Sequence, residues 1–252
     1  MSGHSKWATT KHKKAATDSK RSSLFTKLAK IISIAARDGN DPSMNFRLRM
    51  AIDKAKSLSM PKDNIERAIA RGAGTGESKE LEEIIYEGYG PEGIALIIEI
   101  VTDNRNRVAA DIRHILTKYD GSLGASNSVL WQFQRKGVIY LKNENISEEQ
   151  ELQIIDAGAE DIEKQDNNIR IITAMEDLQK IQEKITKGSD QISRAESRDR
   201  SGGKNIIEID NAELEYIPEN TIKPQNSEKI EKLFEELNEN DDVNNFYSNA
   251  DL

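Results

Sequence analysis

The sequence predicts an α+β protein of several domains, in which a bundle of three helices precedes two mixed α+β domains. Three observations lead to this class. Apolar residues recur at helical spacing as far as about residue 70, the later segments alternate between strand and helix patterns, and a glycine-rich stretch over 71–78 separates the two parts as a hinge. A chain of 252 residues with 36% hydrophobic content can bury the cores that such domains require.

The first part of the chain reads as three amphipathic helices with short connections. The first helix has its apolar stripe over 24–35 and stops at Gly39. The second is expected to begin at Asp41-Pro42, because an N-cap residue followed by proline is a common start signal. The third is expected to follow Pro61 and to end at Gly72.

The part after the hinge is expected to contain both strands and helices. Strands are predicted over 84–89 and 93–102, then a helix capped by Asp103 or Asn104, then a further strand around Val129, Trp131 and Phe133. This set is short of a second helix. The apolar spacing over 226–249 predicts a helix and a strand, so we expect the C-terminal segment to fold back onto residues 79–133.

The segment between these two pieces has the order strand, helix, strand, strand, helix, strand, which is that of a ferredoxin-like unit. Its first helix should carry a capping box formed by Ser147 and Gln150 and should end at Gly158. Polar residues 189–205 are expected to form an excursion. The predicted fold is therefore α+β multidomain: a three-helix bundle over 1–78, then two ferredoxin-like α+β domains, a discontinuous one over 79–133 plus 219–252 and an inserted one over 134–218.

Charge is distributed unequally along the chain. Residues 1–76 carry 16 basic and 6 acidic side chains, a net charge of +10, whereas the remainder carries 20 basic and 38 acidic side chains. A locally positive surface attracts polyanions even when the whole molecule, here with a net charge of −8, is acidic. On a single helix such residues usually only solvate one face, but eight basic residues and one acid within 1–30 favour a binding role.

Other kinds of chemistry find little support in the sequence. The chain has no cysteine and no apolar run long enough to cross a bilayer, which indicates a cytoplasmic protein without a membrane partner. The glycines over 72–76 lack the Lys-Ser/Thr of a phosphate loop, the histidines lack metal-ligand spacing, and the glycine-bearing run 124–128 lacks the second glycine of a nucleophile elbow. We therefore expect no catalytic residue, no metal site, no cofactor and no small-molecule substrate.

The N-terminal arm is the strongest candidate for a nucleic-acid contact. Lysines there can pair with phosphates, and Trp7 offers either a flat surface for an unpaired base or a packing anchor for the arm. The candidate binding residues are His4, Lys6, Trp7, Lys11, His12, Lys13, Lys14, Lys20, Arg21 and Lys27. Secondary candidates are Arg47, Arg49, Arg105 and Arg107.

Long runs of the sequence also resemble a known family. The runs GHSKWATTKHKKAATDSKR, FTKL, AIDKA, MPKDNIERAI, YEGYGPEGIALIIEIVTDNRNR, SLGASNSVLWQFQRKGVI and DDVNNFYSNADL are similar to the YebC/PmpR family, which includes the mitochondrial translational activator of cytochrome oxidase subunit I. The resemblance implies a helical N-terminal domain and two α+β domains. One departure is Phe46, which stands where relatives tend to have proline.

The resemblance implies a non-enzymatic regulator of gene expression and leaves two targets open. Members of the family are generally described as DNA-binding transcriptional regulators. The mitochondrial branch and some bacterial members resemble ribosome-associated, RNA-binding translation factors. The Lys, Trp and His residues of the arm suit single-stranded loops of RNA, and no helix-turn-helix signature is visible. Both DNA and ribosomal RNA therefore remain candidate partners.

Overall fold

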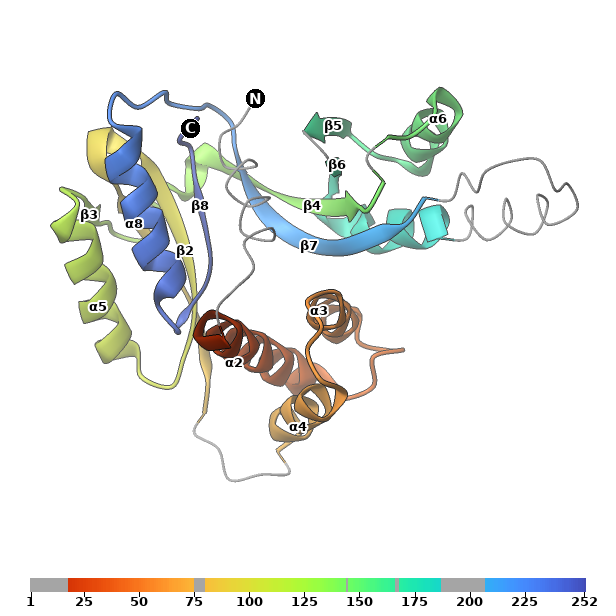
Figure 1. The fold of residues 1–252 in the computed structure, drawn as a ribbon, viewed down its shortest axis with the longest axis horizontal. Helices are drawn as coiled ribbons and strands as arrows, with labels where there is room; N and C mark the ends of the chain where they lie inside the picture. Colours follow the sequence, from red (N-terminus) through yellow and green to blue (C-terminus); the bar gives the residue numbers. More distant parts are fainter. Residues whose placement is uncertain (1–17, 75–79, 144, 166–167, 187–206) are drawn as a thin grey trace, which may run out of the picture. The chain divides into compact units, whose positions relative to one another are not determined.

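The computed structural model describes residues 18–74, 80–143, 145–165, 168–186 and 207–252 (Figure 1). The chain divides into two compact units, one formed by Met1–Gln134 with Tyr216–Leu252 and the other by Arg135–Glu215. Helices and two four-stranded sheets make it an α+β multidomain protein, as the sequence predicts. None of the helices in these described ranges is long and apolar enough to span a membrane.

Three helices occupy the start of the described chain, α2 (Asp18–Ala35), α3 (Phe46–Ser57) and α4 (Lys62–Gly72). A short 3-10 turn, Ala36–Asp38, extends α2, and Gly39 then ends it at a φ of 142°. The apolar stripes meet in one core made by Leu28, Ile32, Leu48, Ile52, Ala55, Met60, Ile65 and Ala68. The expected three helices are thus present, each with its apolar side inward.

The start of α3 differs from the sequence prediction. Asp41 was expected to cap this helix, but the N-cap is Asn45, whose side-chain oxygen accepts a hydrogen bond from the Leu48 amide at 3.0 Å. The Asn45 amide group also donates to the carbonyl oxygens of Ala35 and Gly39, each at 2.7 Å. Asp41 caps only a local turn through Ser43. Asn45 is the cap because its side chain hydrogen-bonds both a free amide at the start of α3 and carbonyl groups at the end of α2.

Gly72 has a packing role that the hinge prediction missed. It is the last residue of α4, and a Cβ added there would lie 2.1 Å from the Ser33 carbonyl oxygen of α2 and 2.7 Å from the Ala36 Cβ. Ser33 donates a hydrogen bond to the Ala68 carbonyl at 2.9 Å beside this contact. The close approach of α2 and α4 therefore requires glycine here. Residues 75–78 of the predicted hinge lie outside the described residues.

The first sheet has the order β3-β1-β2-β8, with β1 at Glu82–Tyr89, β2 at Ala95–Thr102, β3 at Ser122–Leu123 and β8 at Val243–Ser248. Each neighbouring pair is antiparallel, and β8 pairs with β2 from Leu96 to Ile100. A short 3-10 turn, Pro91–Gly93, joins β1 to β2. The C-terminal segment thus forms an edge of the sheet that residues 82–123 begin.

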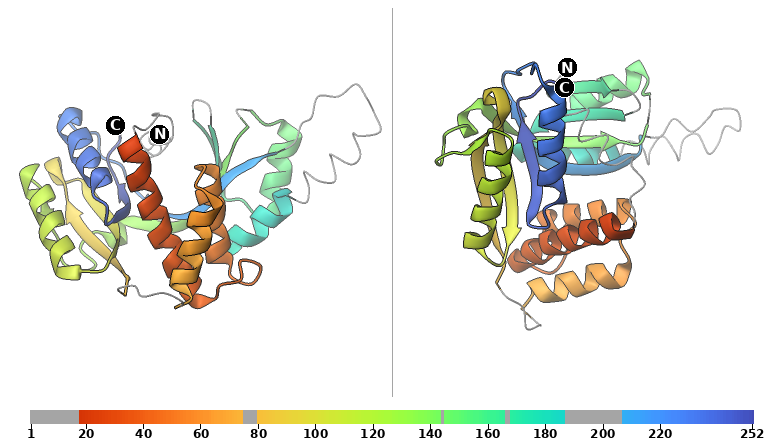
Figure 2. Two further views of the ribbon diagram at one scale, coloured as in Figure 1. Left: turned by 60° about the horizontal axis from the view of Figure 1, so that its bottom comes forward. Right: turned by 60° about the vertical axis from the view of Figure 1, so that its left-hand side comes forward.

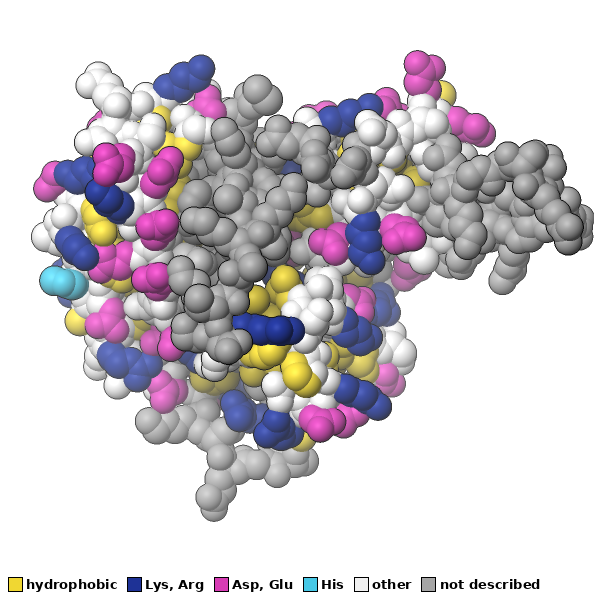
Figure 3. All heavy atoms as spheres, in the orientation of Figure 1, with side chains coloured by type: hydrophobic (Ala, Val, Ile, Leu, Met, Phe, Trp, Pro, Cys, Tyr) yellow, Lys and Arg dark blue, Asp and Glu magenta, His cyan; other side chains and the backbone are white. Residues whose placement is uncertain are grey.

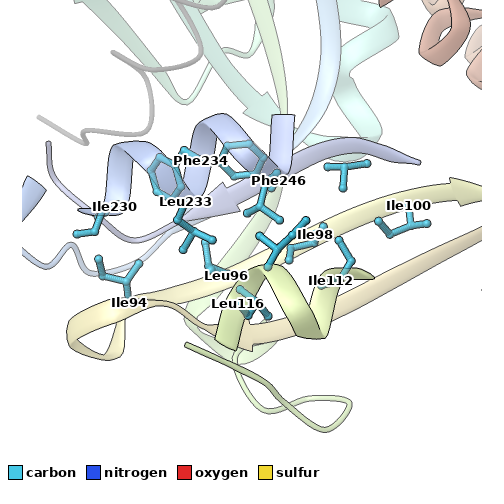
Figure 4. Close-up of a cluster of buried hydrophobic side chains, with 14 of the residues drawn as sticks. Ile94, Leu96, Ile98, Ile100, Ile112, Leu116, Ile230, Leu233, Phe234 and Phe246 are labelled. Atoms are coloured by element: carbon cyan, nitrogen blue, oxygen red, sulfur yellow. The ribbon is translucent and has the colours of Figure 1, made fainter. Parts of the chain in front are cut away.

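Helices α5 (Arg105–Lys118) and α8 (Ser227–Glu239) lie side by side over one face of this sheet (Figures 1 and 2). Asn104 caps α5 and Asn226 caps α8. The side chains between the helices and the strands form one buried cluster that includes Leu96, Ile98, Ile112, Leu116, Leu233, Phe234 and Phe246 (Figure 4). The second helix that residues 79–133 lack is therefore supplied by α8.

The segment around Trp131 is not the strand that its alternating pattern predicts. Residues Leu130–Gln132 form a 3-10 turn, and β4 begins only at Phe133. Val129 and Phe133 are buried in a second cluster with Ala95, Ile97, Tyr216 and Tyr247, whereas Trp131 is exposed. Alternate burial therefore arises here from a turn whose flanking residues face the core, rather than from a pleated strand.

The second sheet has the order β5-β6-β4-β7, with β4 at Phe133–Leu141, β5 at Asp161–Gln165, β6 at Asn168–Ala174 and β7 at Ile209–Pro218. Helix α6 (Glu148–Ala157) has the predicted capping box and ends at Gly158, whose φ is 116°. A 3-10 turn, Met175–Asp177, leads into helical residues 178–186. The strand and helix order is that of a ferredoxin-like unit. The predicted excursion over 189–205 lies outside the described residues.

A buried polar cluster lies within this second unit. Arg170 of β6 pairs with Glu215 at 3.3 Å and with Glu163 at 3.2 Å, and the Tyr140 hydroxyl donates to Glu215 at 2.6 Å. Burial, with the nearby Glu215 charge, raises the pKa of Tyr140 well above 10.0, so the phenol stays protonated and keeps donating. The charges of this cluster are paired within the unit, which indicates a structural role.

Candidate nucleic-acid interface

Helices α2 to α4 carry an excess of positive charge on a small, well-packed scaffold. Residues 21–74 contain 11 basic and 5 acidic side chains. Figure 3 shows Lys and Arg side chains on the visible face of this helical region, interspersed with a few carboxylates. Exposed basic residues of the region are Arg21, Arg37, Arg47, Lys56, Lys62, Arg67 and Arg71. Such a surface can hold a polyanion through phosphate contacts that need no fixed base sequence.

Most of the predicted arm lies outside the described residues, namely His4, Lys6, Trp7, Lys11, His12, Lys13 and Lys14. Lys20 belongs to the first turn of α2. Arg21 follows it with an exposed side chain, whose guanidinium carbon lies 5.5 Å from the centroid of the Phe25 ring. A guanidinium stacked on an aromatic ring keeps its charge and its donors accessible on the other side. Arg21 therefore extends the arm's positive charge onto the folded helix.

Lys27 is placed differently from what its position in the sequence suggests. Its side chain is buried, and its ammonium group donates to the carbonyl oxygen of Asn238 at the end of α8. Lys30, one turn later, donates to the Asp241 carbonyl at 2.9 Å and pairs with Asp242 at 2.7 Å. These lysines join α2 to the C-terminal segment. Lys27 is therefore held in an internal contact rather than presented to a ligand.

Two of the secondary candidates also make internal ion pairs. Arg47 pairs with Glu83 of β1, although both side chains remain partly exposed. Arg107 reaches Asp103 at 3.1 Å and Asp242 at 2.7 Å. The hydrogen bond to Asp242 is the main reason why the pKa of Arg107 is raised above its ordinary value. An arginine already bound to two carboxylates has less to gain from a phosphate.

The other two secondary candidates, Arg49 and Arg105, differ in exposure. Arg49 is half-buried, and its guanidinium carbon lies 5.2 Å from the centroid of the Phe46 ring. Arg105 begins α5 with an exposed side chain, and its carbonyl oxygen accepts from the Tyr86 hydroxyl at 3.4 Å. Arg49 also donates to the Pro42 carbonyl at 3.4 Å. The structure therefore leaves Arg21 and Arg105 better presented than Lys27, which is buried, and Arg107, which is bound to two carboxylates.

Asp242 accepts hydrogen bonds from both Lys30 and Arg107. Burial alone would raise the pKa of its carboxyl, but hydrogen bonds from Lys30 and Arg107 outweigh burial and hold the pKa below 3.8. The carboxylate stays charged at neutral pH and links helices α2 and α5 beside the start of β8. Nothing in the sequence pairs these residues, because 212 and 135 positions separate Asp242 from Lys30 and Arg107.

The surface around Trp131 was missed by sequence reasoning. Its indole nitrogen donates to the Ser128 carbonyl at 3.0 Å, while the side chain stays exposed. The preceding turn is held from β1 by the buried carboxylate of Glu87, which accepts hydrogen bonds from the backbone amides of Asn127, Val129 and Leu130. A signal was present in the sequence, since a lone tryptophan follows an uncharged, glycine-bearing run.

Comparison with known proteins accounts for almost the whole chain. The TACO1/YebC N-terminal domain model matches residues 5–75, and the model of the second and third TACO1/YebC domains matches 81–201 and 202–250. The chain belongs to the TACO1/YebC family. The resemblance seen in the sequence is therefore confirmed, and the basic region with its arm corresponds to the family's N-terminal domain.

Several curated relatives match over nearly their full length. A "Probable transcriptional regulatory protein" from Chlorobium chlorochromatii is 49% identical over 100% of this chain and 96% of its own. One from Thermoanaerobacter pseudethanolicus is 46% identical over 100% of this chain and 98% of its own. The crystal structure of a conserved hypothetical protein from Aquifex aeolicus superposes with a TM-score of 0.80 at 39% identity, covering 94% of this chain and 93% of that one.

All ten primary candidates except His4 fall inside the match to the TACO1/YebC N-terminal domain. Arg47 and Arg49 lie within it as well, whereas Arg105 and Arg107 lie in the match to the second and third domains. Within the described residues, no group of three His, Asp or Glu side chains is arranged to hold a metal ion. The positive charge of the first domain is thus the main chemical feature of the candidate interface.

Proposed function

We propose that this chain is a non-enzymatic regulator of gene expression that binds nucleic acid through its basic N-terminal region. The observation that carries the proposal is the opposition of charge, +10 over residues 1–76 and −18 over the rest. Positive charge confined to one region brings a polyanion to that region, while the acidic remainder discourages adhesion elsewhere. The names of the relatives, "Probable transcriptional regulatory protein", support regulation as the outcome.

DNA is the partner that these names favour. Binding would rest first on phosphate contacts, made by the arm residues Lys6, Lys11, Lys13 and Lys14 and by the exposed arginines of α2 to α4. Phosphate contacts position a protein on a duplex without reading its sequence. A regulator of particular genes would need additional contacts to base edges in a groove.

A ribosome-associated translation factor is the second candidate, and the composition of the arm favours it. Lysines interleaved with Trp7, His4 and His12 suit the unpaired bases and irregular backbone of ribosomal RNA. In either case we place the protein in the cytoplasm, which suits a chain without cysteine.

The proposal is tested by measuring the affinity of the full chain for labelled oligonucleotides of equal length. Single-stranded RNA, single-stranded DNA and duplex DNA are compared by fluorescence anisotropy over a range of salt concentrations. Binding that weakens steeply with salt is expected for at least one of them. An absence of binding to all three at low salt would refute the proposal.

The choice between the two partners needs a second measurement. Lysate is fractionated on a sucrose gradient and in parallel by recovery of chromosomal DNA, and the protein is followed in both. Co-sedimentation with ribosomes that survives DNase and disappears on ribosome dissociation supports the translation factor. Recovery with DNA that survives RNase supports the transcriptional regulator.

A further inference from the structure

We propose that residues 124–132, here called the Trp131 loop, form a second contact to single-stranded nucleic acid, in which an unpaired base stacks on the indole of Trp131. The inference rests on the proposed function and adds a site that the basic region does not contain. Three observations carry it. They are the lack of charge in the loop, the exposure of Trp131, and the way Glu87 holds the backbone.

The first observation is the absence of charge. Residues 121–134 form a run of 14 residues without Asp, Glu, Lys or Arg, in a chain in which 32% of residues are charged. It is the longest uncharged run of the sequence, yet its residues 125–127 are exposed. Exposed protein surface is usually charged for solubility. A surface without acidic or basic side chains suits an uncharged ligand group such as a nucleobase, and it does not suit a phosphate.

The second observation is the exposure of a large aromatic side chain with a fixed orientation. Trp131 is 71% exposed, and its indole nitrogen donates to the Ser128 carbonyl at 3.0 Å. Val129 on one side and Phe133 on the other are buried in the core. The indole nitrogen is therefore satisfied inside the protein while the ring surface remains open. Tryptophan combines a large apolar ring with a polar N–H group and is enriched at contact surfaces.

The third observation is that the loop is held in one conformation by a buried acid. The Glu87 carboxylate accepts hydrogen bonds from the amides of Asn127 at 2.6 Å, Val129 at 2.8 Å and Leu130 at 2.8 Å. The Glu87 carbonyl also accepts from the Gly124 amide at 2.7 Å. A buried carboxylate must offset its desolvation, and here it does so by fixing the backbone. A fixed loop loses less conformational entropy when it binds.

The neighbouring side chains favour a nucleobase over other flat or apolar ligands. The loop carries hydroxyl and amide side chains at Ser126, Asn127 and Gln132, and such groups can both donate and accept hydrogen bonds. The edges of nucleobases carry the same mixture of donors and acceptors. A lipid surface would require more apolar area, and the loop itself contains no lysine. In a duplex both faces of each base are already stacked, so the loop should select single strands.

The test exploits the fact that the chain contains two tryptophans, Trp7 and Trp131. In the full-length Trp7→Phe variant, all indole fluorescence comes from Trp131. Three ligands of equal length are compared: a single-stranded oligonucleotide, the matching duplex, and an abasic strand with the same phosphates and no bases. Stacking predicts quenching by the single strand alone, while anisotropy confirms that the abasic strand still binds.

Affinity provides an independent readout. Trp131→Ala is expected to weaken binding of the single strand by roughly 5- to 150-fold, which corresponds to about 1–3 kcal/mol for one stacked base, and to leave binding of the abasic strand unchanged. Trp131→Phe keeps an aromatic face and should restore most of the affinity. Leu152→Ala, which removes an exposed apolar side chain from the other unit, serves as the matched control and should change neither affinity.

The outcomes separate this inference from the proposed function. If the single strand binds but causes no quenching, and Trp131→Ala binds it as tightly as the parent, the inference is overturned while nucleic-acid binding stands, and the loop would then be a protein contact. Equal quenching by the abasic strand would also overturn it. If none of the three ligands binds, the proposed function itself fails. The melting temperature of Trp131→Ala should match the parent's, since the side chain is exposed.

Discussion

At the scale of single residues, a few buried or partly buried polar groups determine which basic side chains remain available. Asp242 binds Lys30 and Arg107, and the Asn238 carbonyl binds Lys27. These partners lie more than a hundred positions away in the sequence, so charge counting assigned Lys27 and Arg107 to the ligand. The location of the positive region could be predicted from the sequence. Its internally paired members could not, because pairing depends on the fold.

Asp242→Asn should destabilise the protein by about 1–3 kcal/mol at neutral pH, because two charge-assisted hydrogen bonds no longer have an anionic acceptor. The pKa of Asp242 is lower in the folded protein than its ordinary 3.8. Its stabilisation is therefore complete above the ordinary value and is lost as the pH falls through the folded value. Urea unfolding gives the free energy of unfolding of the parent and of Asp242→Asn across the pH range. The difference between the two free energies should be constant near neutral pH and should become smaller in acid. A difference that became smaller as the pH rose from acid to neutral would contradict the assignment.

The change in stability caused by Gly72→Ala distinguishes helix propensity, which would stabilise the protein, from overpacking, which would destabilise it. Alanine is the better helix former, so propensity alone would stabilise α4 by about 0.5–1 kcal/mol. The added Cβ would, however, meet the Ser33 carbonyl at 2.1 Å. We expect a net destabilisation of about 1–3 kcal/mol from overpacking, measured by chemical denaturation. Ala70→Gly, at an exposed position of the same helix, is the control and should cost only the propensity difference. A more stable Gly72→Ala protein would show that α2 and α4 do not approach this closely.

At the scale of elements, most helices and strands could be predicted because their apolar spacing is regular. The capping box of α6 and the end of this helix at Gly158 could also be predicted, since both depend on residues close together in the sequence. The start of α3 could not, because Asp41-Pro42 imitates a helix start while Asn45 contacts Ala35 and Gly39 of the preceding element. The helix itself begins at the next residue, Phe46.

Substitutions at Asn45 and Asp41 test which of the two residues caps α3. Asn45→Ala should destabilise the helical region by about 1–2 kcal/mol or more, because the substitution removes the helix cap and two further hydrogen bonds. Asn45→Asp keeps the acceptor for the Leu48 amide and should destabilise the region less. Asp41→Ala removes only turn contacts to Ser43 and should have the smallest effect. Thermal and urea unfolding give the ranking, and a larger destabilisation by Asp41→Ala than by Asn45→Ala would restore the sequence prediction.

The Trp131 loop illustrates why one element was misassigned. Val129, Trp131 and Phe133 alternate in burial as a strand would, and strand was the reasonable interpretation of that period. The actual turn depends on Glu87, which is 42 positions from Val129 and reaches it only because β1 lies beside the turn. Such a long-range hydrogen bond leaves no local pattern. The candidate site at Trp131 therefore became visible only in the folded chain.

At the scale of the whole molecule, the sequence predicted the class of the fold and the region expected to bind. The C-terminal segment supplies α8 and β8 to the sheet that residues 82–123 begin, and the strand order of the second unit fits a ferredoxin-like domain. The three-domain division with boundaries near 78, 133 and 219 remains a prediction, as does the binding role of the arm. The division rests on the sequence pattern of helices, strands and the glycine-rich hinge, and the role of the arm rests on its charge.

The most direct test of the central claim, that the basic N-terminal region holds phosphates, is the salt dependence of binding by the Lys11→Ala, Lys13→Ala, Lys14→Ala triple variant. The control is the triple Ala variant at Lys223, Lys229 and Lys232, which removes equal charge near α8, outside the basic region. In the arm variant, the slope of log affinity against log salt should shrink by roughly 0.7 to 0.9 for each phosphate that the arm no longer binds, with the melting temperature unchanged. The control variant should keep the parent's slope. An arm variant with the parent's slope and a lower melting temperature would contradict the claim and make the arm a structural element.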